Sequence, residues 1–182
     1  MGEGAWLVAF LAAQRLAELV WARRNTARLL AAGGVEIGAA HYPLMVSLHA
    51  AWLFGLWLLG HDRPVDPAWL AVFVLLQLGR LWVLASLGGR WTTRIIVLPG
   101  AAPVARGPYR WFRHPNYCVV ALEIAVVPLA LGLPAVAAIF SLANAAMLTI
   151  RIRAENRALA WAGRAKTAKT AKTALTPTLA NP

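Results

Sequence analysis

The 182-residue chain is 60% hydrophobic and only 14% charged, and its mean hydropathy is +0.60. Soluble domains carry roughly 25% charged residues, so this composition excludes an ordinary soluble domain and indicates a protein that lies in lipid. A net charge of +11 would suit nucleic acid, but the basic residues lie between apolar segments and in the tail, as in membrane proteins. We therefore expect membrane lipid, and no nucleic acid, as a partner. The single cysteine, Cys118, excludes an internal disulfide and a multi-cysteine metal site, and we expect no metal.

Apolar segments of about 20 residues predict helices that cross a membrane. Gly132 and Pro134 separate the last two segments, which predicts a tight helical hairpin. The predicted fold class is all-α: a multi-pass transmembrane helical protein of about five spans with a C-terminal helical hairpin. The five expected spans are residues 5–22, 43–60, 68–87, 117–133 and 134–150.

Charge in the connecting segments predicts the orientation. Arginines are frequent after the first, third and fifth spans, whereas the loop after the second span is nearly balanced, with Asp62, Arg63 and Asp66. Positively charged loops remain on the cytoplasmic side. The N-terminus is therefore expected outside and all three basic regions in the cytoplasm. We expect a bacterial inner membrane as the location, with any active site facing the cytoplasm.

The segment 88–116 differs from the spans around it. Residues 91–97 (WTTRIIV) have strand-like composition, and Pro99-Gly100 and Gly107-Pro108 are turn signals. These features predict a short cytoplasmic strand-like loop, folded as a local hairpin over the membrane surface.

The tail has a pattern of its own. Residues 165–174 repeat Ala-Lys-Thr every three residues, which matches neither a helix nor a strand period. We expect this stretch to be disordered or loosely attracted to anionic lipid. The expected organisation is an N-terminal three-span region (1–87), a core with the helical hairpin (88–160) and a basic low-complexity tail (161–182).

Polar groups in or beside spans are costly, so each needs a reason. One group is the loop GPYRWFRHPNY at 107–117, in which Pro115 fixes the entry to the fourth span. A second is Glu123, which lies inside an apolar helix. A third is RIRAEN at 151–156, in which Arg151 and Glu155 share one helix face.

Each group also has a purely structural explanation. The loop would serve as an aromatic and basic belt at the membrane interface. Glu123 would be a packing carboxylate tied to Arg15 or His49. The third group would be a positively charged segment beside the last span, with an ion pair along the helix. The hairpin, however, brings the start of the fourth span beside the end of the fifth. It should therefore place the loop opposite Arg151 and Glu155, in a polar pocket at the cytoplasmic surface.

Three features together resemble the cofactor core of the isoprenylcysteine carboxyl methyltransferase family over roughly residues 88–160: GPYRWFRHPNY, an apolar hairpin with a Glu, and RIRAENRAL. The upstream strings QRLAELVWARRN, GGVEIGAAHYPLM and RWTTRIIVLPGAAPV are similar to a bacterial branch encoded near type III polyketide synthases. Members of that branch methylate alkylpyrone or alkylresorcinol hydroxyls. The family usually has two acidic residues in tandem on the last helix, where this chain has Glu155 and Asn156.

This resemblance implies an integral membrane O-methyltransferase that uses S-adenosylmethionine. The implied acceptor is lipophilic, either an isoprenylcysteine-like carboxylate or an alkylpyrone or alkylresorcinol hydroxyl. A nicotinamide-dependent membrane reductase and a non-catalytic membrane scaffold remain alternatives. The implied residues are Arg151 and Glu155 for catalysis, Tyr109, Arg113, His114, Pro115, Tyr117 and Glu155 for the cofactor, and Glu123 and Arg153 for the substrate or for support of the site.

Overall fold

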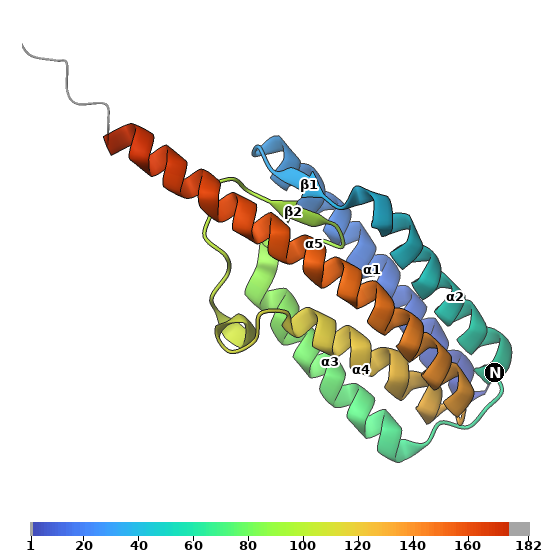
Figure 1. The fold of residues 1–182 in the computed structure, drawn as a ribbon. Coiled ribbons are helices and arrows are strands. Elements are labelled where there is room, and N and C mark those ends of the chain that lie inside the picture. Colours follow the sequence, from blue (N-terminus) through green and yellow to red (C-terminus); the bar gives the residue numbers. More distant parts are fainter. Residues whose placement is uncertain (1, 175–182) are drawn as a thin grey trace, which may run out of the picture.

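The computed structural model describes residues 2–174, with side chains described up to residue 164. Its helices form one elongated bundle, and a small two-stranded sheet lies at one end (Figure 1). The helices are α1 (Glu3–Ala31), α2 (Tyr42–Gly60), α3 (Pro67–Leu87), α4 (Pro115–Ala130) and α5 (Pro134–Ala174). The strands are β1 (Val35–Ile37) and β2 (Ile95–Val97), and the short 3₁₀ turns are η1 (Ala39–His41), η2 (Gly88–Arg90) and η3 (Gly107–Arg110).

Four of the described helices are long and apolar enough to cross a membrane, namely α1, α2, α3 and α5. The expected span at 117–133 is the exception, because α4 has only 16 residues, about 24 Å at 1.5 Å per residue. Residues 131–133 form the turn of the hairpin instead of extending the helix. The prediction of a multi-pass, all-α membrane protein is confirmed, with α4 as a shorter apolar helix.

The helices converge at the end of the bundle that holds the N-terminus (Figure 1). A side chain at Gly4 would overlap the carbonyl oxygen of Gly60, so α1 and α2 approach there as closely as backbones can. The Asp66 N–H donates to the Ala130 carbonyl over 2.8 Å, which joins the start of α3 to the end of α4. Short α4 therefore still runs back along α3 to this end.

The predicted C-terminal hairpin forms between α4 and α5. Gly132 has a φ of 65°, a left-handed conformation that costs glycine little, and Pro134 begins α5. The two helices run antiparallel and pack along their length (Figure 1). The hairpin thus returns the chain to the level at which α4 began.

The strand-like composition of 91–97 is confirmed in part, but the local hairpin is wrong. β2 pairs with β1, antiparallel, with Val35 opposite Val97 and Ile37 opposite Ile95. The residues after Val97 form no strand among those described, so β2 finds its partner in the connection between α1 and α2. Ile95 and Val97 then pack on the alanines of α5.

The expected disorder of 165–174 is also wrong, because α5 continues as a helix to Ala174. Alanine and lysine are strong helix formers, and their propensity outweighs the absence of an amphipathic period. Residues 175–182, the rest of the predicted tail, lie outside the described residues.

A cluster of charged side chains lies buried in the middle of the bundle. Glu123 on α4 accepts from Arg15 of α1 (2.6 Å) and from Arg80 of α3 (Nε, 3.0 Å). Arg80 also donates to Glu18 over 3.0 Å, and Arg15 to Glu18 over 3.1 Å. Gln77 donates to Glu123 over 2.8 Å. We call Arg15, Glu18, Arg80 and Glu123 the charge cluster; its two acids and two bases balance, and it ties three helices together.

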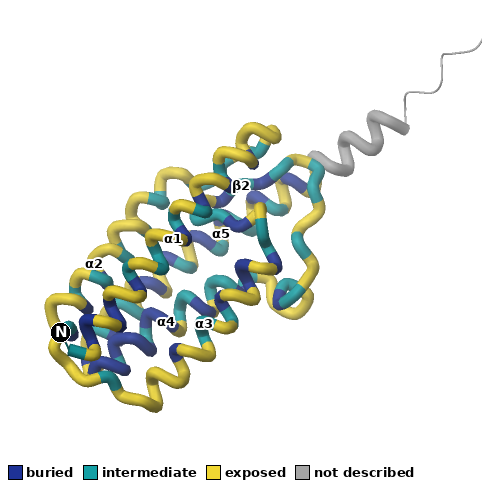
Figure 2. Tube along the Cα trace, turned by 180° about the vertical axis from the view of Figure 1, so that it is seen from behind, coloured by how far each residue is buried: buried dark blue, intermediate teal, exposed yellow. Residues whose placement is uncertain are grey.

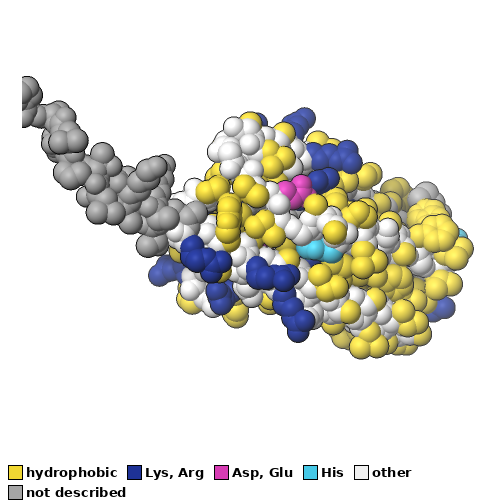
Figure 3. Space-filling view, turned by 45° about the horizontal axis from the view of Figure 1, so that its top comes forward, with side chains coloured by type: hydrophobic (Ala, Val, Ile, Leu, Met, Phe, Trp, Pro, Cys, Tyr) yellow, Lys and Arg dark blue, Asp and Glu magenta, His cyan; other side chains and the backbone are white. Residues whose placement is uncertain are grey.

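The outer faces of the bundle are apolar. Exposed residues follow the outside of the helices, and buried ones face inward (Figure 2). On the face drawn in Figure 3, most of the coloured arginine side chains lie toward the end where α5 leaves the bundle, and hydrophobic side chains dominate elsewhere. Large apolar side chains such as Trp6, Phe54 and Leu142 are more than half exposed. A surface of this kind is matched to lipid.

We predict that Arg80→Ala destabilises the protein by about 3–5 kcal/mol, because it leaves two buried carboxylates with one cation between them. The free energy of unfolding would be measured in detergent, with exposed Arg63→Ala as the control. The double variant Arg80→Met/Glu123→Leu restores charge balance and should recover part of the loss. A double variant as unstable as the single one would contradict this explanation.

Candidate functional site

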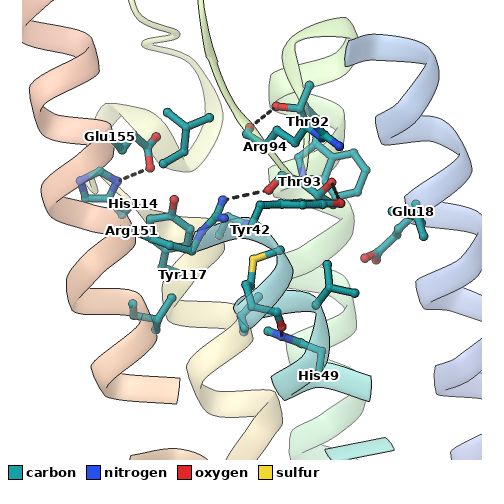
Figure 4. Close-up of a pocket in the computed structure, with 18 of the residues that line it drawn as sticks. Glu18, Tyr42, His49, Thr92, Thr93, Arg94, His114, Tyr117, Arg151 and Glu155 are labelled. Atoms are coloured by element: carbon teal, nitrogen blue, oxygen red, sulfur yellow. Dashed lines mark hydrogen bonds and ion pairs between the residues drawn. The ribbon is translucent and has the colours of Figure 1, made fainter. Parts of the chain in front are cut away.

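A cavity of about 530 Å³ lies inside the bundle, between the charge cluster and the sheet. All five helices and β2 contribute to its lining, and Figure 4 shows its labelled polar side chains. Small-molecule sites in proteins have volumes of about 300–1,000 Å³. The cavity is therefore large enough for a ligand of the size of a nucleoside cofactor.

Most of the predicted site residues line this cavity, on the side nearest the basic end of the bundle. The lining includes Tyr109, Arg113, His114, Tyr117, Arg151 and Glu155. Pro115 is buried as the first residue of α4 and does not line the cavity. A smaller adjoining hollow of about 160 Å³ shares Tyr109, Arg113 and Glu155.

The hairpin brings His114 to the face of α5. Its Nδ1 lies 3.4 Å from a Glu155 carboxylate oxygen (Figure 4). Its Nε2 lies 3.3 Å from Asn156 Oδ1. The imidazole also stacks on the Tyr117 ring, with centroids 5.4 Å apart and planes 18° from parallel. His114 and Tyr117 therefore form an aromatic stack, and contacts with α5 fix its orientation.

Arg151 is a buried cation on the polar side of the cavity near the basic end, only 6% exposed. Its Nη2 donates to the Thr93 carbonyl over 2.9 Å, and its guanidinium carbon lies 5.8 Å from the centre of the Tyr117 ring. Its Nη1 has no hydrogen-bond partner among the described residues. A buried N–H that lacks a partner is costly, so this geometry favours an anionic or carbonyl group of a ligand at Nη1.

Two further groups complete the polar side. Burial, with the nearby Glu155 carboxylate as a smaller cause, holds the pKa of Tyr109 above its ordinary value, so its phenol stays protonated and can donate. Asn116 Oδ1 is buried and has no partner in the part of the chain that the structure describes. The cavity therefore offers both donors and acceptors to a ligand.

Arg153 and Glu123 lie elsewhere. Arg153 is exposed and does not line the cavity, because it lies about 200° around the helix from Arg151. Glu123 is fully buried in the charge cluster, where it holds Arg15 and Arg80. The interpretation of Glu123 as a packing carboxylate tied to Arg15 is thus confirmed. No hydrogen bond between Glu123 and His49 is found among the described residues.

The side of the cavity formed by the first three helices was not predicted from the sequence. Arg15, Glu18 and Arg80 form its polar floor, and Tyr42, Met45 and His49 line one wall. The signal was available, since Arg15, Glu18, His49 and Arg80 are polar residues inside apolar spans. Thr93 carried no such signal, because its contact with Arg151 depends on how the sheet pairs.

Comparison with known proteins identifies the family of the chain. The family model of the isoprenylcysteine carboxyl methyltransferase (ICMT) family matches residues 69–161. The chain is 42% identical over 159 residues to the uncharacterized protein YpbQ of Bacillus subtilis (strain 168), covering 84% of this chain and 94% of that protein. No solved structure shows significant similarity. The chain therefore belongs to the isoprenylcysteine carboxyl methyltransferase family, and it is a multi-pass integral membrane methyltransferase.

Proposed function

We propose that the protein transfers a methyl group from S-adenosylmethionine to an oxygen atom of a lipophilic acceptor. The observation that carries this proposal is the cavity, which joins a polar side at the basic end of the bundle to an apolar side between α1 and α2. Leu16 and Val46 line that apolar side and are also 64% and 42% exposed. A water-soluble cofactor and an acceptor dissolved in lipid can therefore meet in one cavity.

The residues of the polar side fit S-adenosylmethionine. Glu155 and Asn116 Oδ1 can accept from its ammonium or ribose hydroxyls, and the aromatic stack of His114 and Tyr117 suits a flat ring. We assign Tyr109, Arg113, His114, Tyr117 and Glu155 to cofactor binding, with Pro115 as the residue that positions His114. The cofactor, when bound, supplies an electrophilic methyl group on a sulfonium.

The protein's own part is positioning and exclusion of water. Arg151 keeps its charge at all relevant pH values, so it can hold the attacking oxygen without giving up a proton. Glu155 orients the site through His114. Glu123 acts indirectly, because it holds the two arginines of the cavity floor in place.

The acceptor is an amphiphile with an ionisable oxygen. Two chemical forms suit Arg151: an isoprenylcysteine-like carboxylate, as in the family's name, and an alkylpyrone or alkylresorcinol hydroxyl, as in the polyketide-associated branch that the upstream strings resemble. Arg151 and the apolar side of the cavity can accept either form.

The test is methyl transfer from a cofactor labelled in its methyl group, in membranes that contain the protein. We expect label in a lipid-extractable product that forms with either N-acetyl farnesylcysteine or a 5-alkylresorcinol. Absence of a labelled product with both acceptors would overturn the proposal.

We predict that His114→Ala and Tyr117→Phe each weaken binding of S-adenosylhomocysteine by about 1–3 kcal/mol, because each removes a polar contact. Binding would be measured as thermal stabilisation in detergent, with His61→Ala at the far end of the bundle as the control. Stabilisation of the wild type by NADPH instead would indicate a reductase, and stabilisation by neither ligand a scaffold.

We predict that Arg151→Lys lowers turnover at least about 10-fold, while affinity for S-adenosylhomocysteine stays near that of the wild type. Lysine keeps the charge but loses the planar fork that holds Thr93 and the acceptor together. Exposed Arg153→Lys is the matched control and should be silent in both assays. Parallel loss of affinity and turnover would assign Arg151 a structural role with Glu155.

We also propose that the cavity's polar side faces the bacterial cytoplasm, because the basic segments lie at that end. A reporter fused after residue 182 should be active in the cytoplasm, and one inserted after Arg63 should be active outside. The opposite pattern of activity would reverse the orientation.

A further inference from the structure

His49 is a titratable group inside the cavity that the mechanism above does not use. It lies on α2 and lines the cavity together with Glu18 and Arg151 (Figure 4). Arg15 and Arg80 line the same cavity. Arg15, Arg80 and Arg151 all lie near enough to interact electrostatically with it. His49 lies outside residues 69–161, the part that the family model matches.

A local hydrogen bond fixes which ring nitrogen of His49 is free. Its Nδ1 lies 2.9 Å from the Met45 carbonyl oxygen, one turn earlier on the same helix. A carbonyl oxygen can only accept, so Nδ1 carries the proton. In the neutral imidazole Nε2 then holds a lone pair. No described residue is hydrogen-bonded to Nε2, and the side chain faces the cavity.

The other candidate bases of the cavity are occupied. Glu18 accepts from Arg15, Arg80 and Gln14. Glu155 lies against Nδ1 of His114 and Asn156 against its Nε2, so neither Glu155 nor His114 is free. An arginine cannot accept a proton. Among the described residues that line the cavity, His49 is therefore the basic group left to act.

We propose that His49 is a catalytic base that takes the proton of a hydroxyl group on the acceptor. This role rests on the proposed O-methyl transfer and deepens it, because a carboxylate acceptor is already ionised and has no proton to give. The acceptor is then an amphiphile with a phenolic or enolic hydroxyl.

The proposed step removes a proton from the acceptor oxygen and joins the methyl group to that same oxygen. The hydroxyl proton moves to His49 Nε2, and the oxygen uses its electron pair to form the new bond to the methyl carbon. The electron pair of the broken carbon–sulfur bond stays with sulfur, which becomes a neutral thioether. His49 returns its proton to water. The guanidinium of Arg151 stabilises the negative charge on oxygen before the bond forms.

The test is His49→Gln, which keeps a hydrogen-bonding side chain but cannot take up a proton. We expect turnover of a 5-alkylresorcinol to fall about 100-fold or more, while turnover of N-acetyl farnesylcysteine, where the wild type accepts it, is unchanged. His61→Gln is a matched control, because His61 Nδ1 also lies 2.9 Å from the carbonyl oxygen of the residue four before it. Equal loss with both acceptors would mean a structural role and overturn the proposal.

A second measurement needs no methyl donor. A long-chain alkyl nitrophenol, whose ionised form absorbs visible light, is bound to wild-type protein and to His49→Gln in detergent. We expect the ionised fraction of bound probe to be several-fold higher in the wild type. Equal fractions would overturn the proposal, as would a wild type that methylates only the carboxylate acceptor. Since this arm uses no cofactor, its result stands even where the proposed methyl transfer fails.

Discussion

The fold depends on the balanced pairing of two acids and two bases inside the bundle. In lipid, apolar side chains give helices little reason to prefer one partner or register over another. Glu123 bonds to α1 through Arg15 and to α3 through Arg80, so these contacts fix how α4 sits against both helices. Removing any one member leaves an uncompensated buried charge, which makes the arrangement specific as well as costly to disturb.

The same cluster explains where the cavity lies. α2 and α5 contribute no charged residue to the cluster, so the space between it and these two helices is free for other use. Three members of the cluster also line the cavity, namely Arg15, Glu18 and Arg80. One wall of the cavity is therefore polar, while α2 supplies a more apolar wall with Met45 and Leu53. A site for a hydrophobic acceptor follows from this division.

The sequence predicted the polar side well because that side depends on local geometry. A hairpin with a two- or three-residue turn must return to its starting level, so His114 had to lie near Glu155. Helical spacing also places Arg151 and Arg153 on different faces of α5, although the sequence alone did not show which of the two lines the cavity. The partner of β2 was not predictable in the same way, because it lies about 60 residues earlier in the chain. Thr93 was missed for that reason, whereas His49 on α2 carried a signal as a polar residue inside an apolar span.

The family's pattern has two tandem acids where this chain has Glu155 and Asn156, and the structure gives this difference a physical meaning. Glu155 lies beside one ring nitrogen of His114 and Asn156 beside the other. A second carboxylate could only accept from the ring, so both ring nitrogens would need protons to satisfy both acids. An amide can instead turn its NH₂ toward the ring and donate. Asn156 therefore holds the His114 ring without placing a second carboxylate beside it, and it keeps that ring stacked on Tyr117.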